Sequence, residues 1–400
     1  MTTLPVPATL PRAQVVGHRE ARVGRTLPGY LLLPRPKDLV KALVVPLAFG
    51  VGVLAEGGVD QELLVRAALV WGALELLVYQ ARYPWNDVRG FAADQAHPES
   101  ASRGRLPGPA AKARLHVGAS TVVALLRLLL TAALALLVPE VAGLLLAATA
   151  GVFGVAAVYE RLRAAATGRT SQLPVPLRPA LLALWVAVGA GYAVRGLTGL
   201  ALAVDLGGRP GTAVTAGVAM WALGVVFVTC RWVLEAMCFG RVEGGRLVWH
   251  ARSDQAREHT LGLVRWLPED ATEVVADLRD WRALQAATPL TAPWHLALAV
   301  AAGAALLTGL LLVEAPGRAA AAVTVVAGAA AAVAVALAVG RRRVVAALLA
   351  VALVGVLAAL GTARPVVAVL PWAVVLTGYG CFTRQCAAEV GDTLRRMRRR

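Results

Sequence analysis

Long apolar windows dominate this sequence and limit the folds that it can adopt. About ten stretches have roughly the 17 to 25 residues that a helix needs to cross a lipid bilayer. They begin near Leu39, Leu63, Val117, Val141, Ala180, Gly211, His295, Ala319, Val344 and Pro365. Because a segment in lipid must satisfy its backbone hydrogen bonds internally, we expect an all-α, polytopic transmembrane helical bundle of about nine or ten helices.

The composition agrees with a membrane bundle and excludes an ordinary soluble domain. Hydrophobic residues make up 58% of the chain and charged residues only 16%. The 39 glycines suit helices that approach one another closely in lipid. The formal net charge of +16 falls between the apolar windows, which favours anionic lipid headgroups or phosphate substrates and argues against nucleic acid as a partner.

Basic residues concentrate in every second connection, which predicts the orientation. These segments are the N-terminal arm, the connections 82–114, 161–178, 231–282 and 341–343, and the tail 395–400. Short basic connections stay in the cytoplasm, so we expect a multi-pass cell-membrane protein with a cytoplasmic N-terminus and cytoplasmic active-site loops. The predicted division is a polar basic arm over 1–34, a transmembrane domain over 35–382 with a cytoplasmic loop over 235–289, and a basic tail over 383–400.

Some polar residues stand out within or beside the apolar windows. Glu75 lies within the second window, where charge is costly, and we consider Arg127 as its partner, in a cavity or in a structural ion pair. The segment 254–266 mixes charged and apolar residues and predicts an interfacial amphipathic helix.

The connection after the second window carries two carboxylates on one helical face. Asp87 and Asp94 are seven residues apart, about two helical turns, and Asn86 adds a neutral oxygen. Such an incomplete set of oxygen ligands suits magnesium bound to a diphosphate. The same connection carries Arg89 and Arg105, which are suited to gripping phosphate oxygens, or alternatively it is a solvated loop that only orients the protein.

The pattern around these residues resembles a known family motif. It reads Asn86-Asp87-Val88-Arg89, then Asp94, His97-Pro98 and Arg105-Leu106-Pro107-Gly108. It is similar to the first aspartate-rich motif of the UbiA superfamily of intramembrane prenyltransferases. The start of the first window, Arg35-Pro36-Lys37-Asp38-Leu39-Val40-Lys41, resembles the branch that transfers phosphoribose to decaprenyl phosphate.

The resemblance implies roles for particular residues. Asn86, Asp87 and Asp94 would be catalytic and would bind Mg²⁺. The substrate diphosphate would be bound by Lys41, Arg89, Arg103, Arg105, Tyr159 and Arg163. Tyr159 and Arg163 resemble a Tyr-x-x-x-Lys element of the family, with arginine in place of lysine, although a juxtamembrane tyrosine and arginine often only snorkel to the interface.

Two further departures from the family pattern concern the metal motifs. Gly90 stands where the family has the middle aspartate of the first motif. After the sixth window, the second metal motif is represented by Glu235 and by Asp254 and Glu258, which have i, i+4 spacing. These three acids are candidate metal ligands, and ordinary salt-bridged surface charges are the alternative.

The resemblance implies a Mg²⁺-dependent membrane prenyltransferase that ionises an isoprenoid diphosphate and transfers the prenyl group to an unidentified acceptor. A central cavity would open to the cytoplasmic side, with aromatics such as Trp71, Trp85 and Trp185 lining it. Three alternatives remain open: a terpene cyclase, a phosphoribosyl transferase that acts on polyprenyl phosphate, and a non-catalytic isoprenoid-binding or transport protein.

Overall fold

The computed structural model describes most of the chain. The described residues are 26–34, 40–96, 105–108, 110–166, 175–236, 240–244, 246–249, 258–268, 285–313, 317–338 and 340–397. Helices account for nearly all regular structure in these ranges, and the only sheet there is one two-stranded hairpin.

The first half of the bundle contains helices of very different lengths. The elements are α1 (Leu27–Leu32), α3 (Val44–Glu56), α4 (Gln61–Gly72), the π-helix η1 (Ala73–Val78), α5 (Tyr79–Ala96), the 3-10 helix η3 (Ala110–Lys112), α6 (Ala113–Leu137), α7 (Pro139–Ala166), α8 (Pro179–Ala187), α9 (Ala190–Ala201) and α10 (Pro210–Ala236). The segments α4, η1 and α5 follow one another without a gap and form one helical run.

The second half begins with a small hairpin and ends with four long helices. Its elements are β1 (Gly240–Glu243), β2 (Arg246–Trp249), α11 (Glu258–Leu261), the 3-10 helix η5 (Gly262–Trp266), α14 (Pro293–Leu312), α15 (Arg318–Leu337), α16 (Arg342–Ala359) and α17 (Pro365–Met397).

Among the described residues, eight helices are long and apolar enough to cross a membrane. They are α6, α7, the combined α8 and α9, α10, α14, α15, α16 and the apolar part of α17. Each coincides with a predicted window, so the prediction of an all-α polytopic membrane bundle is confirmed at this level. The other two windows correspond to α3, which has 13 residues, and to the run 61–96, whose apolar part includes three charged residues, Glu62, Arg66 and Glu75.

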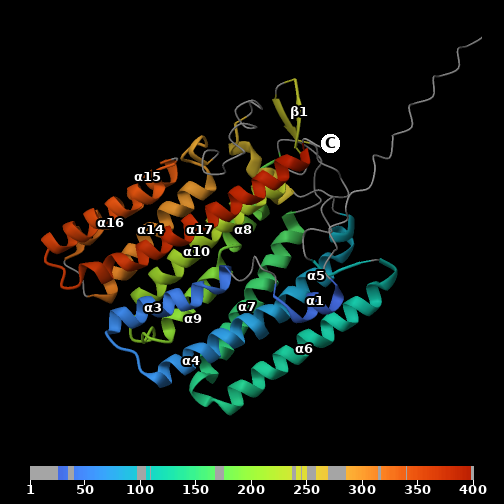
Figure 1. Ribbon diagram of the computed structural model, residues 1–400, viewed down its shortest axis with the longest axis horizontal. Helices are drawn as coiled ribbons and strands as arrows, with labels where there is room; N and C mark the ends of the chain where they lie inside the picture. The colour runs from blue at the N-terminus through green and yellow to red at the C-terminus, as the bar shows by residue number, and fades with distance from the viewer. Residues whose placement is uncertain are drawn as a thin grey trace, which may run out of the picture.

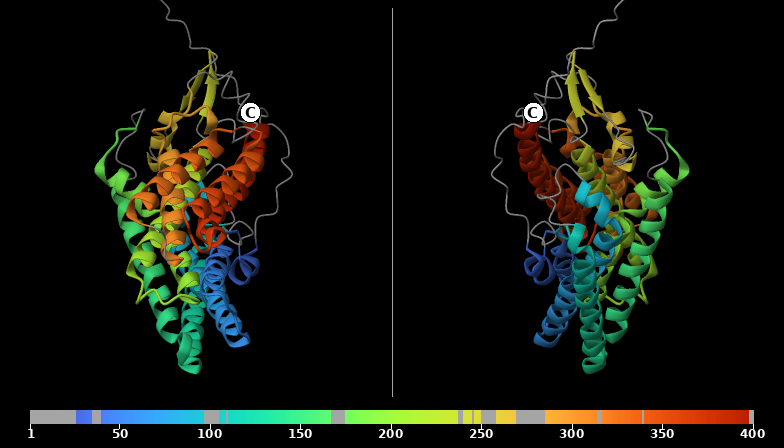
Figure 2. Two further views of the ribbon diagram at one scale, coloured as in Figure 1. Left: turned by 90° about the vertical axis from the view of Figure 1, so that its left-hand side faces the viewer. Right: turned by 90° about the vertical axis from the view of Figure 1, so that its right-hand side faces the viewer.

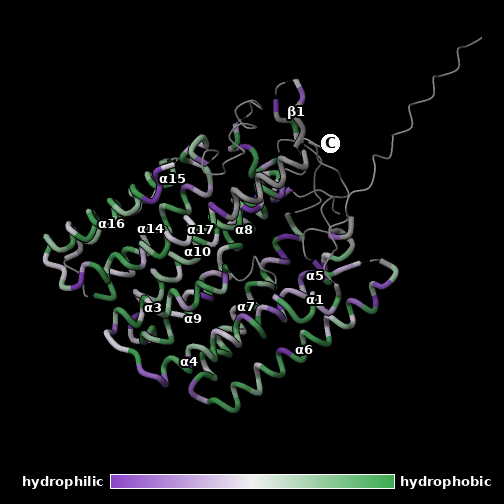
Figure 3. Tube along the Cα trace, in the orientation of Figure 1, coloured by the Kyte–Doolittle hydropathy of each residue, from purple (hydrophilic) through white to green (hydrophobic). Residues whose placement is uncertain are grey.

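The helices lie side by side in one elongated bundle, with the β1–β2 hairpin and the C-terminal end of α17 at the same end (Figures 1 and 2). We call this the hairpin end. The helix shafts are predominantly hydrophobic (Figure 3). Helix α14 packs against α10, α15 and α17, and these helices share the largest hydrophobic core.

Small residues allow the closest helix crossings. A Cβ atom added to Gly309 on α14 would lie 1.9 Å from the carbonyl oxygen of Ala368 on α17. One added to Gly189, between α8 and α9, would lie 2.0 Å from the carbonyl oxygen of Trp221 on α10. Packing through glycine at these two positions therefore sets the spacing of the bundle.

The interruption between α8 and α9 lies inside one membrane-spanning segment. Two backbone carbonyl groups at the interruption accept hydrogen bonds from side chains of neighbouring helices. Trp221 Nε1 donates to the carbonyl of Val186 at 2.7 Å, and the Tyr79 hydroxyl donates to the carbonyl of Gly191 at 2.9 Å. Irregular backbone at membrane depth requires such partners, and here it borders a cavity.

The loop after α10 differs in detail from the prediction. Residues Gly240 to Trp249 include an antiparallel hairpin that the sequence analysis did not anticipate. The predicted amphipathic helix over 254–266 is, in its described part, α11 followed by η5. Residues Glu258 to Leu263 are buried, with contacts to α10, so this part is not an exposed interfacial helix. A mixture of charged and apolar residues predicts that a segment has an apolar face. It does not show whether that face packs against lipid or against the rest of the protein.

Candidate functional site

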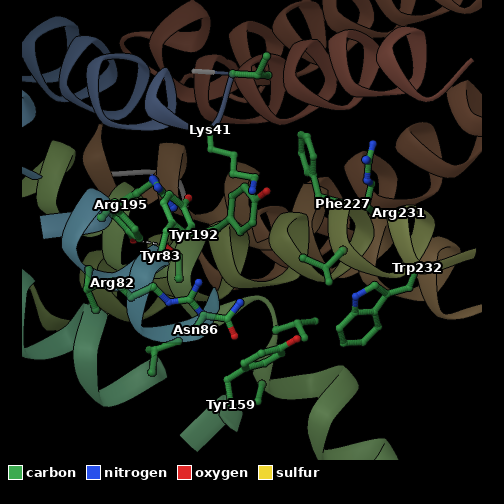
Figure 4. A pocket seen from close by; sticks show the side chains of 18 of the residues that line it. Lys41, Arg82, Tyr83, Asn86, Tyr159, Tyr192, Arg195, Phe227, Arg231 and Trp232 are labelled. Carbon is green, nitrogen blue, oxygen red and sulfur yellow. Dashed lines mark hydrogen bonds between the residues drawn. The ribbon is translucent and has the colours of Figure 1, made fainter. Parts of the chain in front are cut away.

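A cavity of about 250 Å³ lies near the hairpin end between the N-terminal part of the bundle and α10 (Figure 4). Lys41, just before α3, lies on one side of it, and Asn86 from α5 and Tyr159 from α7 lie on the other. The remaining side chains come mainly from α5, α9 and α10. The charged and polar lining residues are Lys41, Tyr79, Arg82, Tyr83, Asn86, Arg105, Tyr159, Tyr192, Arg195, Arg231 and Glu235.

Five residues that the sequence analysis selected meet at this cavity. They are Lys41, Asn86, Arg105, Tyr159 and Glu235. These residues lie on five different segments, and 194 positions separate the first from the last (235 minus 41). The helices therefore bring these separately predicted residues together at one place.

Asp87 lies behind the cavity wall, bound by two donors. It is 1% exposed, its Oδ1 accepts from Arg105 Nη1 at 2.7 Å, and its Oδ2 accepts from the hydroxyl of Tyr30 at 3.0 Å. Tyr30 belongs to α1, inside the segment predicted as a polar arm, and no sequence motif pointed to it. The first-motif carboxylate is therefore fixed from both sides.

Arg105 lies between the two aspartates of the first motif. Its Nε is 3.8 Å from Asp94 Oδ2, in addition to the hydrogen bond with Asp87. Burial alone would lower the pKa of Arg105, but the carboxylates of Asp87, Asp94 and Glu235 outweigh it and raise the pKa further above its usual value. The guanidinium is therefore charged at every pH at which the protein is folded.

Glu160 on α7 contacts several of the predicted residues near Asn86. It accepts from Arg163 at 2.7 Å and lies 3.9 Å from Arg89. With its amide oriented to satisfy both neighbours, Asn86 donates to Glu160 and accepts from Arg105 Nη1 at 3.1 Å. Arg89 and Arg163 thus lie near the site but not in the cavity lining, and Glu160, which the sequence analysis did not select, connects them to Asn86.

The candidates for a second metal motif do not come together in the described residues. Glu235 lines the cavity, whereas Glu258 is buried in an ion pair with Arg178 and does not line it. Asp254 and Arg103 lie outside the described residues.

A buried ion pair closes the deeper part of the cavity. Arg195 Nε donates to Glu75 Oε1 at 2.6 Å, and its guanidinium lies 3.3 Å from the ring centre of Tyr79. The partner of Glu75 is therefore Arg195 and not Arg127. Arg127 donates instead to the backbone carbonyls of Gln80 and Leu31. Glu75 belongs to η1, and the π-helical turn changes which face of the long helix it occupies.

The aromatic lining also differs from the expectation. Trp71, Trp85 and Trp185 are absent from the lining that the structure describes. Trp71 is exposed and donates to the carbonyl of Ala42, and Trp85 stacks on Phe153. The cavity instead presents tyrosines and a few other rings, namely Tyr79, Tyr83, Tyr159, Tyr192, Phe227, Trp232 and Phe382. Tyrosine has an apolar ring and a polar hydroxyl, so it can line a cavity that has both apolar and polar parts.

A second cavity, of about 110 Å³, shares Val40 and Phe227 with the first. It is lined almost entirely by apolar side chains of α3, α9, α10, α14 and α17. Leu43 and Leu47 of its lining are more than 40% exposed, so it reaches the outer surface of the bundle. A polar cavity is thus adjacent to an apolar one, with Val40 and Phe227 in the wall between them.

The family resemblance implies a resident Mg²⁺ ion held by the acidic side chains near the cavity. No group of three His, Cys, Asp or Glu side chains in the described ranges has the arrangement of a metal site. Asp87 has both oxygens engaged by Arg105 and Tyr30, and neither Asp87 nor Asp94 lines the cavity. Within the described part of the chain, these residues do not fit a metal shared between the aspartates and a ligand.

No family model, curated protein or solved structure matches this chain. The cavity and the sequence motif are therefore the features that bear on function.

Proposed function

We propose that this protein is a membrane prenyltransferase of the UbiA type, which ionises an isoprenoid diphosphate and transfers the prenyl group to an acceptor. The observation that carries the proposal is the cavity in which Lys41, Asn86, Arg105, Tyr159 and Glu235 meet. A cationic headgroup site adjacent to an apolar cavity suits an amphiphile that carries phosphate.

The charge of the lining supports a diphosphate ligand. Lysine and arginine contribute five cationic side chains to the described lining, Lys41, Arg82, Arg105, Arg195 and Arg231, against one carboxylate, that of Glu235. Asp87, Asp94 and Glu75 offset part of this charge from behind the wall. Guanidinium groups bind phosphate oxygens through paired hydrogen bonds, and tyrosine hydroxyls add further donors.

The proposed reaction begins with cleavage of the bond between the allylic carbon and the diphosphate oxygen. The electron pair goes to the leaving diphosphate, where the cations of Lys41, Arg82 and Arg231 stabilise the developing charge. The isoprenoid chain occupies the apolar cavity. The allylic cation forms beside Tyr83, Tyr159 and the neighbouring rings, which stabilise it through their π faces. An electron-rich atom of the acceptor then forms the new bond, and a proton is released.

The membrane arrangement follows from the same proposal. The eight candidate spans together with α3 and the run 61–96 would give ten crossings. With an even number, both chain termini and the hairpin end face the cytoplasm, in agreement with the basic connections. The headgroup cavity then opens to the cytoplasmic side of the cell membrane, where soluble acceptors are available.

The test uses purified protein in detergent with prenyl diphosphates of increasing length, with and without aromatic acceptors, and with magnesium or chelator. Diphosphate release and mass spectrometry of the organic extract are measured together. Acceptor-dependent release supports prenyl transfer. Release of a hydrocarbon or terpene alcohol without acceptor would replace it with a cyclase, and absence of release with every diphosphate would overturn the proposal.

A second candidate is a non-catalytic protein that binds an isoprenoid phosphate. The observation that favours it is the neutralisation of carboxylates that the family motif would use, because Asp87 is held by Arg105 and Glu258 by Arg178. For such a protein, the prenyl diphosphate would be bound and recovered unchanged in the same assay.

A further inference from the structure

We infer that Arg105 occupies the position of a metal ion between the aspartates of the first motif, so that the cavity binds a diphosphate headgroup without magnesium. This inference depends on the proposed function for the identity of the ligand. It departs from the metal requirement that the sequence resemblance implies.

The first argument is the placement of charge relative to the cavity. Arg105 and Asn86 line it, whereas the carboxylates of Asp87 and Asp94 lie behind Arg105. A ligand therefore meets a guanidinium and an amide at this wall. In a metal-centred site the carboxylate oxygens and the phosphate oxygens must reach the same ion, so the carboxylates would have to face the ligand.

The second argument is that both carboxylates are already engaged by Arg105. Asp87 accepts from Arg105 at 2.7 Å and from Tyr30 at 3.0 Å, and Asp94 Oδ2 lies 3.8 Å from Arg105 Nε. Asp87 and Asp94 are both buried. A metal ion at this place would have to displace a charged, hydrogen-bonded side chain that is itself only partly accessible.

The third argument concerns Gly90. A Cβ atom at this position would lie 3.3 Å from Asp94 Oδ2, a tight contact. A side chain here would crowd the aspartate that pairs with Arg105, so glycine at this position is compatible with the pair. Glycine at position 90 therefore leaves room for Asp94 beside Arg105.

The same contacts fix the orientation of the Arg105 guanidinium. Asp87, Asp94 and the amide oxygen of Asn86 hold the guanidinium from one side. Arg105 Nε is buried beside Asp94, but the side chain is 23% exposed and lines the cavity, so the N–H groups of its outer end can donate to phosphate oxygens. Because the guanidinium is charged before a ligand arrives, binding requires no prior uptake of a cation.

The experiment measures binding, which separates it from turnover. Full-length protein in lipid nanodiscs is titrated with farnesyl thiodiphosphate by calorimetry, once in magnesium and once in chelator. Similar affinity in both buffers is expected. An affinity at least about tenfold weaker in chelator would overturn the inference, because a bound metal would then contribute the equivalent of a charge-assisted contact.

Variants sharpen the result. Arg105→Ala should weaken binding in chelator about tenfold or more, and magnesium should restore part of it, because the guanidinium no longer occupies the position between the two aspartates. Arg209→Ala is the matched control, since it breaks an ion pair with Glu56 far from the cavity. Wild-type affinity of Arg105→Ala in chelator would overturn the inference.

Asp94→Asn gives a test that does not depend on the folding of Arg105→Ala. If Asp94 holds a metal, this change weakens binding in magnesium, which would overturn the inference. If Asp94 only offsets the charge of Arg105, binding is unchanged or tighter.

Metal-independent binding without any turnover would leave the inference standing and remove the prenyltransferase proposal, whereas metal-dependent turnover would do the reverse. Absence of binding in both buffers would overturn both.

Discussion

The helices around the cavity and the four helices α14 to α17 bury polar side chains for different purposes. Near the cavity, the ion pairs of Asp87 with Arg105 and of Glu75 with Arg195 each have one member in the cavity lining. In the second region, the hydroxyl of Tyr379 donates to Gln285 at 2.8 Å and accepts from Arg342 at 3.2 Å, away from both cavities.

The difference shows how a membrane bundle separates binding from stability. In α14 to α17, the polar groups join helices to one another, and the rest of the contact is made by alanine, valine, leucine and glycine. Around the cavity, the same kinds of group are held by partners on one side and face the cavity on the other. Substitutions in the two regions should therefore change different measured quantities.

The largest effect is expected at the ion pair that closes the cavity. Glu75→Ala leaves Arg195 buried without its partner, which should reduce the free energy of unfolding by about 3–5 kcal/mol. Denaturation of the purified protein in mixed micelles measures this value. Glu62→Ala, which breaks an exposed pair with Arg66, is the control and should cost less than about 1 kcal/mol. Equal effects of the two changes would show that burial of the pair has no consequence.

A glycine of α14 tests the packing side of the comparison. Gly309→Leu places atoms against the carbonyl of Ala368 and should destabilise the protein by about 1–3 kcal/mol or more, because overpacked helices must separate. Gly355→Leu on α16, where an added Cβ meets nothing within 4 Å, is the control. Thermal unfolding and yield after gel filtration compare them. The close crossing would be disproved by a Gly309→Leu protein as stable as its control.

Two tyrosines separate stability from binding directly. Tyr379→Phe removes a hydroxyl that joins two buried partners and should cost about 1–2 kcal/mol of unfolding free energy, with ligand affinity unchanged. Tyr159→Phe should instead weaken diphosphate binding and leave stability within about 0.5 kcal/mol of the wild type. Calorimetry and denaturation of both variants test this pair. A loss of affinity in Tyr379→Phe would contradict the separation of the two regions.

The smallest effect is expected where α17 contributes to the apolar cavity. Cys381 is exposed, unpaired with another cysteine, and part of that lining. In a variant that keeps this cysteine alone, farnesyl thiodiphosphate should slow its reaction with a maleimide, because the prenyl chain covers the sulfur. Inorganic diphosphate is the control and should not slow it. Equal labelling rates with both would place the prenyl chain elsewhere.

The fold was predictable because apolar windows of spanning length are strong signals, and eight of them became candidate spans. The meeting of Lys41, Asn86 and Glu235 was predictable only through the family motif. The partner of Glu75 was not, because Arg195 is 120 positions away and the π turn η1 changes the face that Glu75 presents. Charge alone made Arg127 an equally good candidate.

The aromatic lining was missed for a related reason. Tryptophans in apolar windows were expected at the cavity, yet the structure places mainly tyrosines there, and a tyrosine combines an apolar ring with a polar hydroxyl. Which face of a helix meets the cavity depends on the interruption between α8 and α9 and on the crossing at Gly189, and neither has a clear sequence signature.

The hydrogen bond from Tyr30 to Asp87 has a practical consequence for work with this protein. Residues 1–34 were predicted as a polar basic arm, so a shortened version starting near Lys41 would be a natural choice for expression. Such a version would lack α1 and with it a donor to the aspartate that holds Arg105. Shortened protein should therefore be used for functional assays only after its ligand affinity has been compared with that of the full-length chain.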